Sequence, residues 1–228
     1  MNSARALAVV AVGFIVSGYP ASAQDLSRYR AYALESSLNS VITASGARLD
    51  DAKSLHERPA RIQELEWRAP YVGSGSELAD PVREIAFTFY NDALYQVVVS
   101  YDHDRTEGLT NKDIIESLSA AYGVPLLRSA GTRTSPLAAA LPDTIVLAQW
   151  ENAASSLTLL RGEYAPDFQL ILISKPLSTR ARSAIREAVR LDGIEAPRRE
   201  LEQRKKDVAD AGAARDKTRA TNKAAFRP

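Results

Sequence analysis

One stretch in the middle of the chain, residues 84–102, constrains the fold more than any other. Apolar and polar residues alternate from Ile85 to Phe89, and a β-branched run at 97–99 follows a break at Asn91-Asp92. Two strand-like runs separated by an Asn/Asp pair are typical of a β-hairpin, because these residue types accept the backbone conformation of a tight turn. The sequence therefore predicts a hairpin over 84–101.

A helix with clear boundaries is predicted directly after this hairpin, over 111–122. Thr110 has the side chain of an N-cap, Asp113 lies three residues later as in a capping box, and Gly123 ends the apolar periodicity. Three further strands are then predicted, over 144–150, 156–161 and 168–174.

The preceding part of the chain has the same order of elements. Residues 36–45 form an amphipathic pattern with Ser36 or Ser37 as the cap and Gly46 as the stop. Residues 61–67 are interpreted as a strand, with a short helix as the alternative. A short strand is expected at 26–34, and the segments 68–83 and 128–143, rich in Gly, Pro and Ser, are expected to be loops.

These two series predict a duplicated unit. In each, a helix is followed by a strand that ends near a tryptophan, Trp67 or Trp150, and by a hairpin. We expect two tandem α-β-β-β units, about 28–102 and 110–175, that form one antiparallel sheet with the helices packed on one face, an α+β fold. The alternative is that any helix followed by a meander of strands produces such a match.

The end of the chain divides into a last packed helix and a charged tail. The helix is predicted over 178–192, with Ser178 as its cap, Gly193 as its stop and Pro197 beyond, which closes an α+β domain at 24–197. Residues 198–228 contain ten Lys/Arg and five Asp/Glu, a net charge of +5. The tail has helix-forming residues but few large apolar ones, so a solvated helix and a disordered arm both remain open.

The first 23 residues have the layout of a secretory signal peptide. Arg5 precedes an apolar run from Ala6 to Val16, and the small residues at 21–23 predict cleavage near Ala23-Gln24. As a helix the run rises only about 16 Å, short of the roughly 30 Å bilayer core, so removal is favoured over membrane anchoring. We expect a periplasmic or secreted protein with no transmembrane segment in the mature chain.

Cysteine is absent from the sequence. This excludes disulfides, thiolate metal sites and an acyl anchor on a lipoprotein cysteine. The stability of the exported chain must therefore come from a packed core.

The order of elements over about 36–174 resembles the fold shared by the small outer-membrane assembly lipoproteins and the β-lactamase inhibitor protein. The chain differs from them in its lack of a lipobox cysteine and of disulfides and in its longer basic tail. The phrases FYNDALYQVVVSYD, TEGLTNKDIIESLSAAYG and NKAAFRP are also similar to an uncharacterised group of exported proteobacterial proteins. The fold resemblance implies protein binding rather than catalysis, by analogy alone.

Asp102-His103-Asp104 is the segment whose residue types are best suited to catalysis or metal binding. A histidine between carboxylates can serve as a general base or bind a divalent cation, and the segment partly matches a calcium loop. However, Glu107 stands where that loop requires glycine, and neighbouring side chains of an extended segment point in opposite directions. Asp102 and Asp104 are thus the candidate metal ligands, but a polar loop is favoured, and we expect no catalytic residues and no cofactor.

The basic residues of the tail are the candidates for an interaction site. They could attach the protein to an anionic envelope surface or to an acidic envelope protein. Nucleic acid is an improbable partner, because the protein is exported and no aromatic residues lie between the basic ones to stack on bases. The candidate residues are Arg198, Arg199, Arg204, Lys205 and Lys206.

The sequence thus favours a non-catalytic exported module that binds an envelope protein or has a structural role in the envelope, through its sheet or its tail. The first alternative is a periplasmic small-ligand-binding protein that uses a cleft between the repeats, with Trp67 or Trp150 as an aromatic platform. The second is a hydrolase whose site residues the sequence does not identify.

Overall fold

The computed structural model describes residues 25–70, 80–126, 144–162, 167–225 and 227. The predicted signal peptide and the predicted loop at 128–143 lie outside the described residues, as does the middle of the loop at 68–83.

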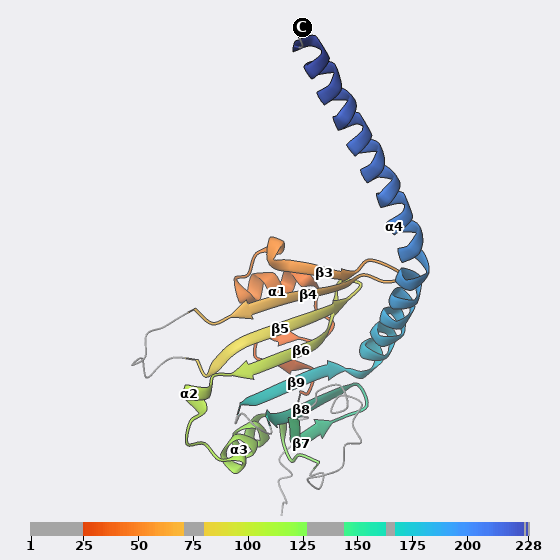
Figure 1. Cartoon of the computed structure of the whole chain (residues 1–228). Helices are drawn as coiled ribbons and strands as arrows, with labels where there is room; N and C mark the ends of the chain where they lie inside the picture. Colours follow the sequence, from red (N-terminus) through yellow and green to blue (C-terminus); the bar gives the residue numbers. More distant parts are fainter. Residues whose placement is uncertain (1–24, 71–79, 127–143, 163–166, 226, 228) are drawn as a thin grey trace, which may run out of the picture.

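One antiparallel sheet organises the described residues (Figure 1). Its strand order is β3-β4-β5-β6-β9-β8-β7, so two meanders are joined through their last strands, β6 and β9, with Val98 opposite Ile171. The prediction of an α+β fold built on a single antiparallel sheet is confirmed. The strands are β3 (Ala52–His56), β4 (Ile62–Arg68), β5 (Val82–Tyr90), β6 (Ala93–Tyr101), β7 (Thr144–Glu151), β8 (Ser155–Gly162) and β9 (Phe168–Ser174).

The predicted hairpin is β5–β6, and its turn is at Asn91-Asp92. Both residues have positive φ, 47° and 71°, as the twist of a two-residue hairpin turn requires. The turn also binds its neighbours, because Asp92 Oδ1 accepts a hydrogen bond from the Leu38 amide (3.1 Å) and Asn91 Oδ1 accepts one from the Arg61 amide (2.9 Å). Two turn residues thus attach the hairpin to the preceding helix and strand.

Helices α1 (Leu38–Ser45) and α3 (Asn111–Tyr122) cover the same face of the sheet (Figure 1). The Ser37 hydroxyl caps α1, and Gly46 ends it in the left-handed conformation. Thr110 and Asp113 form the predicted capping box of α3. Apolar residues of both helices pack into one core with Phe87, Leu159 and Leu172 of the sheet.

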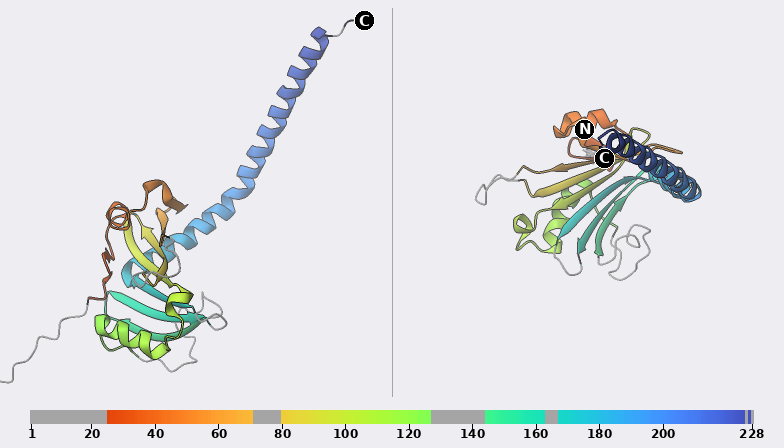
Figure 2. Two further views of the ribbon diagram at one scale, coloured as in Figure 1. Left: turned by 90° about the vertical axis from the view of Figure 1, so that its left-hand side faces the viewer. Right: turned by 45° about the horizontal axis from the view of Figure 1, so that its top comes forward.

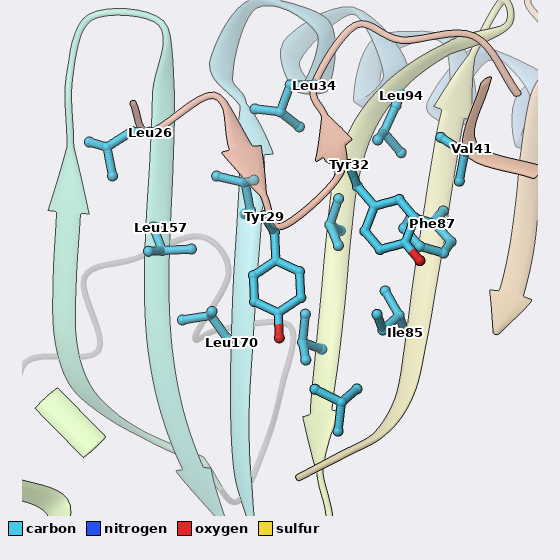
Figure 3. Close-up of a cluster of buried hydrophobic side chains, with 14 of the residues drawn as sticks. Leu26, Tyr29, Tyr32, Leu34, Val41, Ile85, Phe87, Leu94, Leu157 and Leu170 are labelled. Carbon is cyan, nitrogen blue, oxygen red and sulfur yellow. The ribbon is translucent and has the colours of Figure 1, made fainter. Parts of the chain in front are cut away.

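The N-terminal segment completes this core as a small hairpin, β1 (Arg28–Tyr29) and β2 (Tyr32–Ala33). A single strand over 26–34 was predicted, and this is wrong, because the chain reverses at Arg30, which has a φ of 53°. The reversal turns Tyr29 and Tyr32 toward the sheet, where the Tyr32 and Phe87 ring centroids lie 4.6 Å apart (Figure 3).

Helix α4 (Lys175–Ala225) begins on the opposite face of the sheet. Its Leu177, Ala181 and Ile185 pack on Ile62 and Tyr95, whose side chains point away from the main core. The predicted start at Ser178 is wrong. The helix follows β9 directly, the Lys175 amide donates to the Ala154 carbonyl oxygen (2.8 Å), and Ser178 is buried within the first turns.

The predicted helix end at Gly193 is also wrong, since α4 continues through Pro197 to Ala225. The sequence left open whether the tail is a helix or a disordered arm, and residues 198–225 are helical. Figures 1 and 2 show α4 bending where it leaves the body, as a proline inside a helix favours. Three elements were not predicted: β3, the 3₁₀ turn η1 (Leu49–Asp51) and the one-turn helix α2 (His103–Thr106).

Candidate interaction surface on helix α4

The part of α4 that projects from the body, residues 194–225, is called the arm here. Figure 2 shows it extending away from the sheet and the other helices. All of its residues are exposed except Glu195 and Gly212, which are half-buried. Ile194, Leu201 and Val208 are 62%, 53% and 73% exposed, so the arm carries apolar side chains that the described body does not cover.

The base of the arm is attached to the β3–β4 turn by a group of ion pairs, called the junction here. Arg58 of that turn pairs with Glu195, and Arg199 pairs with Asp192 (2.9 Å) and Glu195 (3.1 Å). The hydrogen bond from Arg58 lowers the pKa of Glu195, and Arg199 lowers it further. These contacts lie on both sides of Pro197 and fasten the helix at the position where its backbone hydrogen bonding is weakest.

A cavity of about 260 Å³ lies at the junction, open to solvent. This is smaller than the roughly 300–1,000 Å³ of typical small-molecule sites, and its wall contains charges of both signs. The cavity therefore favours neither a cation nor an anion. Its lining residues are Ser54, Leu55, His56, Glu57, Arg58, Asp192 and Arg199.

The five basic residues predicted as an interaction site all lie on the arm, but they differ in their surroundings. Arg199 belongs to the junction. Arg198 lies 3.8 Å from Glu202, Arg204 lies 4.0 Å from Glu200, and Lys205 and Lys206 are exposed. Exposed pairs at this distance contribute little to stability and leave the side chains available to a partner.

Charge is distributed unevenly along the arm. Residues 194–214 contain five basic and five acidic residues, and residues 215–227 contain five basic and one acidic. The positive excess of the tail therefore lies at its far end, beyond the five residues that the sequence indicated.

The two candidate metal ligands, Asp102 and Asp104, are not brought together as a binding site. Asp102 caps α2, because its Oδ1 accepts a hydrogen bond from the Arg105 amide (3.1 Å), and Asp104 is exposed. His103 Nδ1 lies 3.4 Å from Asp167 Oδ1. Within the described part of the chain, no three His, Cys, Asp or Glu side chains are grouped so that they could hold a metal ion.

The two tryptophans lie in different environments. Trp150 is 2% exposed and its indole N–H donates to the Gly123 carbonyl oxygen (2.6 Å), so it connects β7 to the end of α3 as part of the core. Trp67 is half-buried at the edge of the same core. Neither lines the junction cavity.

Sequence reasoning missed a polar cluster that fastens the N-terminal hairpin. Arg30 pairs with Asp80 (Nη2 to Oδ1, 2.8 Å), and its guanidinium carbon lies 5.3 Å from the centroid of the Tyr29 ring. The charge of Arg30 also acts on Tyr101 and Tyr122. Burial raises the pKa of Tyr29 and of Tyr101, and it raises the pKa of Tyr122 to about 12. Arg30 and Asp80 are far apart in the sequence, so no local pattern indicated the pair.

Comparison with protein-family models, with curated proteins and with solved structures finds no significant match to this chain. The resemblance to the outer-membrane assembly lipoproteins and to the β-lactamase inhibitor protein therefore stays a prediction. Among the helices that the structure describes, none has both the length and the apolar character needed to cross a bilayer.

Proposed function

We propose that this protein is an exported, non-catalytic binding module of the cell envelope, and that the arm is its contact surface. One observation carries the proposal, namely that residues 194–225 form a helix exposed along almost its whole length. Ordering such a helix costs conformational entropy that no packing on the described body offsets. Apolar side chains displayed on it are therefore best explained by a macromolecular partner.

The two alternatives have less support. A small-ligand-binding protein needs an enclosed, mostly apolar pocket, and the cavity at the junction, within the described part of the chain, is instead open and lined largely by charged and polar residues. A hydrolase needs a nucleophile, a base and a group that orients them, and the His103–Asp167 pair is exposed and is the one acid–base pair with a histidine among the described ion pairs.

An anionic envelope surface is a second candidate partner, and a specific observation favours it. The basic excess at 215–227 would be attracted to lipid head groups or acidic polymers. The absence of a broad apolar face disfavours insertion of the arm into the bilayer, so this binding would be electrostatic and would weaken as salt is raised.

The proposal is tested with the mature chain and with a chain that ends at residue 200. Each is immobilised and exposed to envelope extract, and each is sedimented with vesicles that contain an anionic phospholipid. We expect the full chain to retain a component or vesicles that the shortened chain does not. Equal retention by both chains would show that the arm is not the contact surface.

A matched variant separates the two partners. Replacing Arg215, Lys217, Arg219 and Lys223 with Gln removes the distal charge and keeps good helix-forming residues. Loss of vesicle binding with unchanged capture of a protein would assign the partner to the protein class. Loss of vesicle binding by the variant, when the unsubstituted chain captures no protein, would assign the partner to the anionic surface.

A further inference from the structure

The exposed apolar residues of the arm follow a heptad repeat. Ile194, Leu201 and Val208 are separated by seven residues each, the spacing that keeps side chains on one stripe of a two-stranded coiled coil. The positions one and two heptads earlier, Glu187 and Arg180, are charged. The apolar stripe therefore begins where α4 leaves the body.

This stripe points away from the body. Successive residues of a helix are rotated by about 100°, so residues two apart lie on nearly opposite sides. Asp192 and Arg199 line the junction cavity, and Ile194 and Leu201 follow them by two residues. Glu195, which pairs with Arg58, is rotated by about 100° from Ile194 and so also lies off the stripe. A second helix could thus lie along the stripe without displacing the junction.

The charges beside the stripe define the polarity of such a partner. If Ile194, Leu201 and Val208 occupy the a positions of the heptad, the e positions hold Arg198, Lys205, Gly212 and Arg219. The g positions hold Glu200 and Asp207, together with uncharged residues. Two copies aligned in parallel place Glu200 of one beside Lys205 of the other, whereas antiparallel copies place basic e residues beside one another.

We propose that the partner of the proximal arm is a second copy of this chain, in a parallel, in-register coiled coil over residues 194–214. The proposal rests on the proposed function, whose contact surface it assigns to a particular partner. The segment is charge-neutral, so two copies do not repel each other there. Arg215 occupies the next a position and ends the apolar stripe, and the basic far ends of the two arms repel each other, so the helices separate beyond residue 214 and their ends are free for other contacts.

The pairing is of moderate strength. The d positions contain Pro197, Arg204 and Ala211, which bury less apolar surface than the leucines of a stable coiled coil. We therefore expect a dimer that dissociates on dilution, which sedimentation velocity over a concentration series detects.

Cysteine cross-linking gives the sharpest test, because the chain has no cysteine of its own. In a parallel, in-register pair, residues at an a position lie beside their own copies, so Val208→Cys in the full mature chain should form a disulfide-linked dimer on mild oxidation. Ala213→Cys is the control, on the far side of the same helix. Equal cross-linking of the two variants, or of neither, would overturn the proposal.

Substitution of the stripe gives an independent measurement. Leu201→Lys combined with Val208→Lys should weaken dimerisation by at least about tenfold, since it buries charge in the seam. Ala213→Lys, which adds a charge outside the seam, should leave the dissociation constant within about twofold. A monomer at every concentration for the unsubstituted chain would contradict the pairing.

Charge reversal tests the polarity. Glu200→Lys should weaken the dimer, and adding Lys205→Glu should restore it, because the reversed pair meets again only in the parallel arrangement. Failure of the double variant to recover would overturn the parallel assignment. A chain that is monomeric and yet captures an envelope component through its arm would keep the proposed function and overturn self-pairing.

Discussion

Alanine is frequent in both halves of α4, but it is buried against the sheet in the first half and exposed in the arm. In the first half, Ala181, Ala184 and Ala188 are buried, and their small size lets the helix lie close to the sheet. In the arm, Ala209 and Ala213 are exposed and lie outside the proposed seam, so they contribute only helix propensity. One continuous helix is thus stabilised by tertiary packing at one end and, at the other, by its own sequence together with the junction.

An aspartate placed in the first half of α4 and one placed in the arm should differ most in their effect on the free energy of unfolding. Ala181→Asp buries a carboxylate in a fully covered position, and we expect it to lower the free energy of unfolding by about 3 kcal/mol or more. Ala213→Asp should change it by about 0.5 kcal/mol or less. Urea denaturation followed by circular dichroism measures both, and similar losses for the two variants would mean that the arm packs on the body.

Alkaline pH should destabilise the body through its buried tyrosines, which have no counterpart in the arm. The folded-state pKa of Tyr29, Tyr101 and Tyr122 is raised above the ordinary value near 10, mainly by burial, whereas residues 175–228 contain no tyrosine. The unfolded chain loses these protons first, so the contribution of the tyrosines to the free energy of unfolding should be constant below pH 9 and fall between pH 10 and 12. Replacing Tyr101 with Phe should reduce the slope over that range, and an unchanged slope would assign the effect to other groups.

Removing the arm beyond residue 200 should have the smallest effect on the stability of the body. The deleted segment is exposed and the junction is kept, so we expect the melting temperature of a dilute sample to change by about 2 °C or less. A thermal scan by circular dichroism should also show loss of helical signal. A fall of many degrees would show that the distal arm stabilises the body.

Much of the fold could be predicted because local signals and tertiary structure agree. The Asn91-Asp92 turn and the Thr110–Asp113 capping box were identified as they occur in the structure. The strand β3 was missed because Ala52–His56 lies at the edge of the sheet and is mostly exposed, so its residues do not alternate between apolar and polar.

The candidate surface could be predicted only in part. Gly193 and Pro197 are both common helix stops, and their presence separated Ile194 from the residues that follow it in the heptad. Arg58 and Glu195, whose ion pair attaches the helix to the body between these two stops, are far apart in the sequence. Such a long-range contact can stabilise a helix where the local sequence predicts its end. A prediction from neighbouring residues alone does not include it.

The continuity of α4 past Pro197 has a geometric consequence. Residues 198–225, at a rise of 1.5 Å each, extend about 42 Å. The helix is therefore a spacer of fixed length, and a partner bound at its tip is held at a fixed distance from the sheet. Shortening it by whole turns would move that attachment point inward by about 5.4 Å per turn without rotating it.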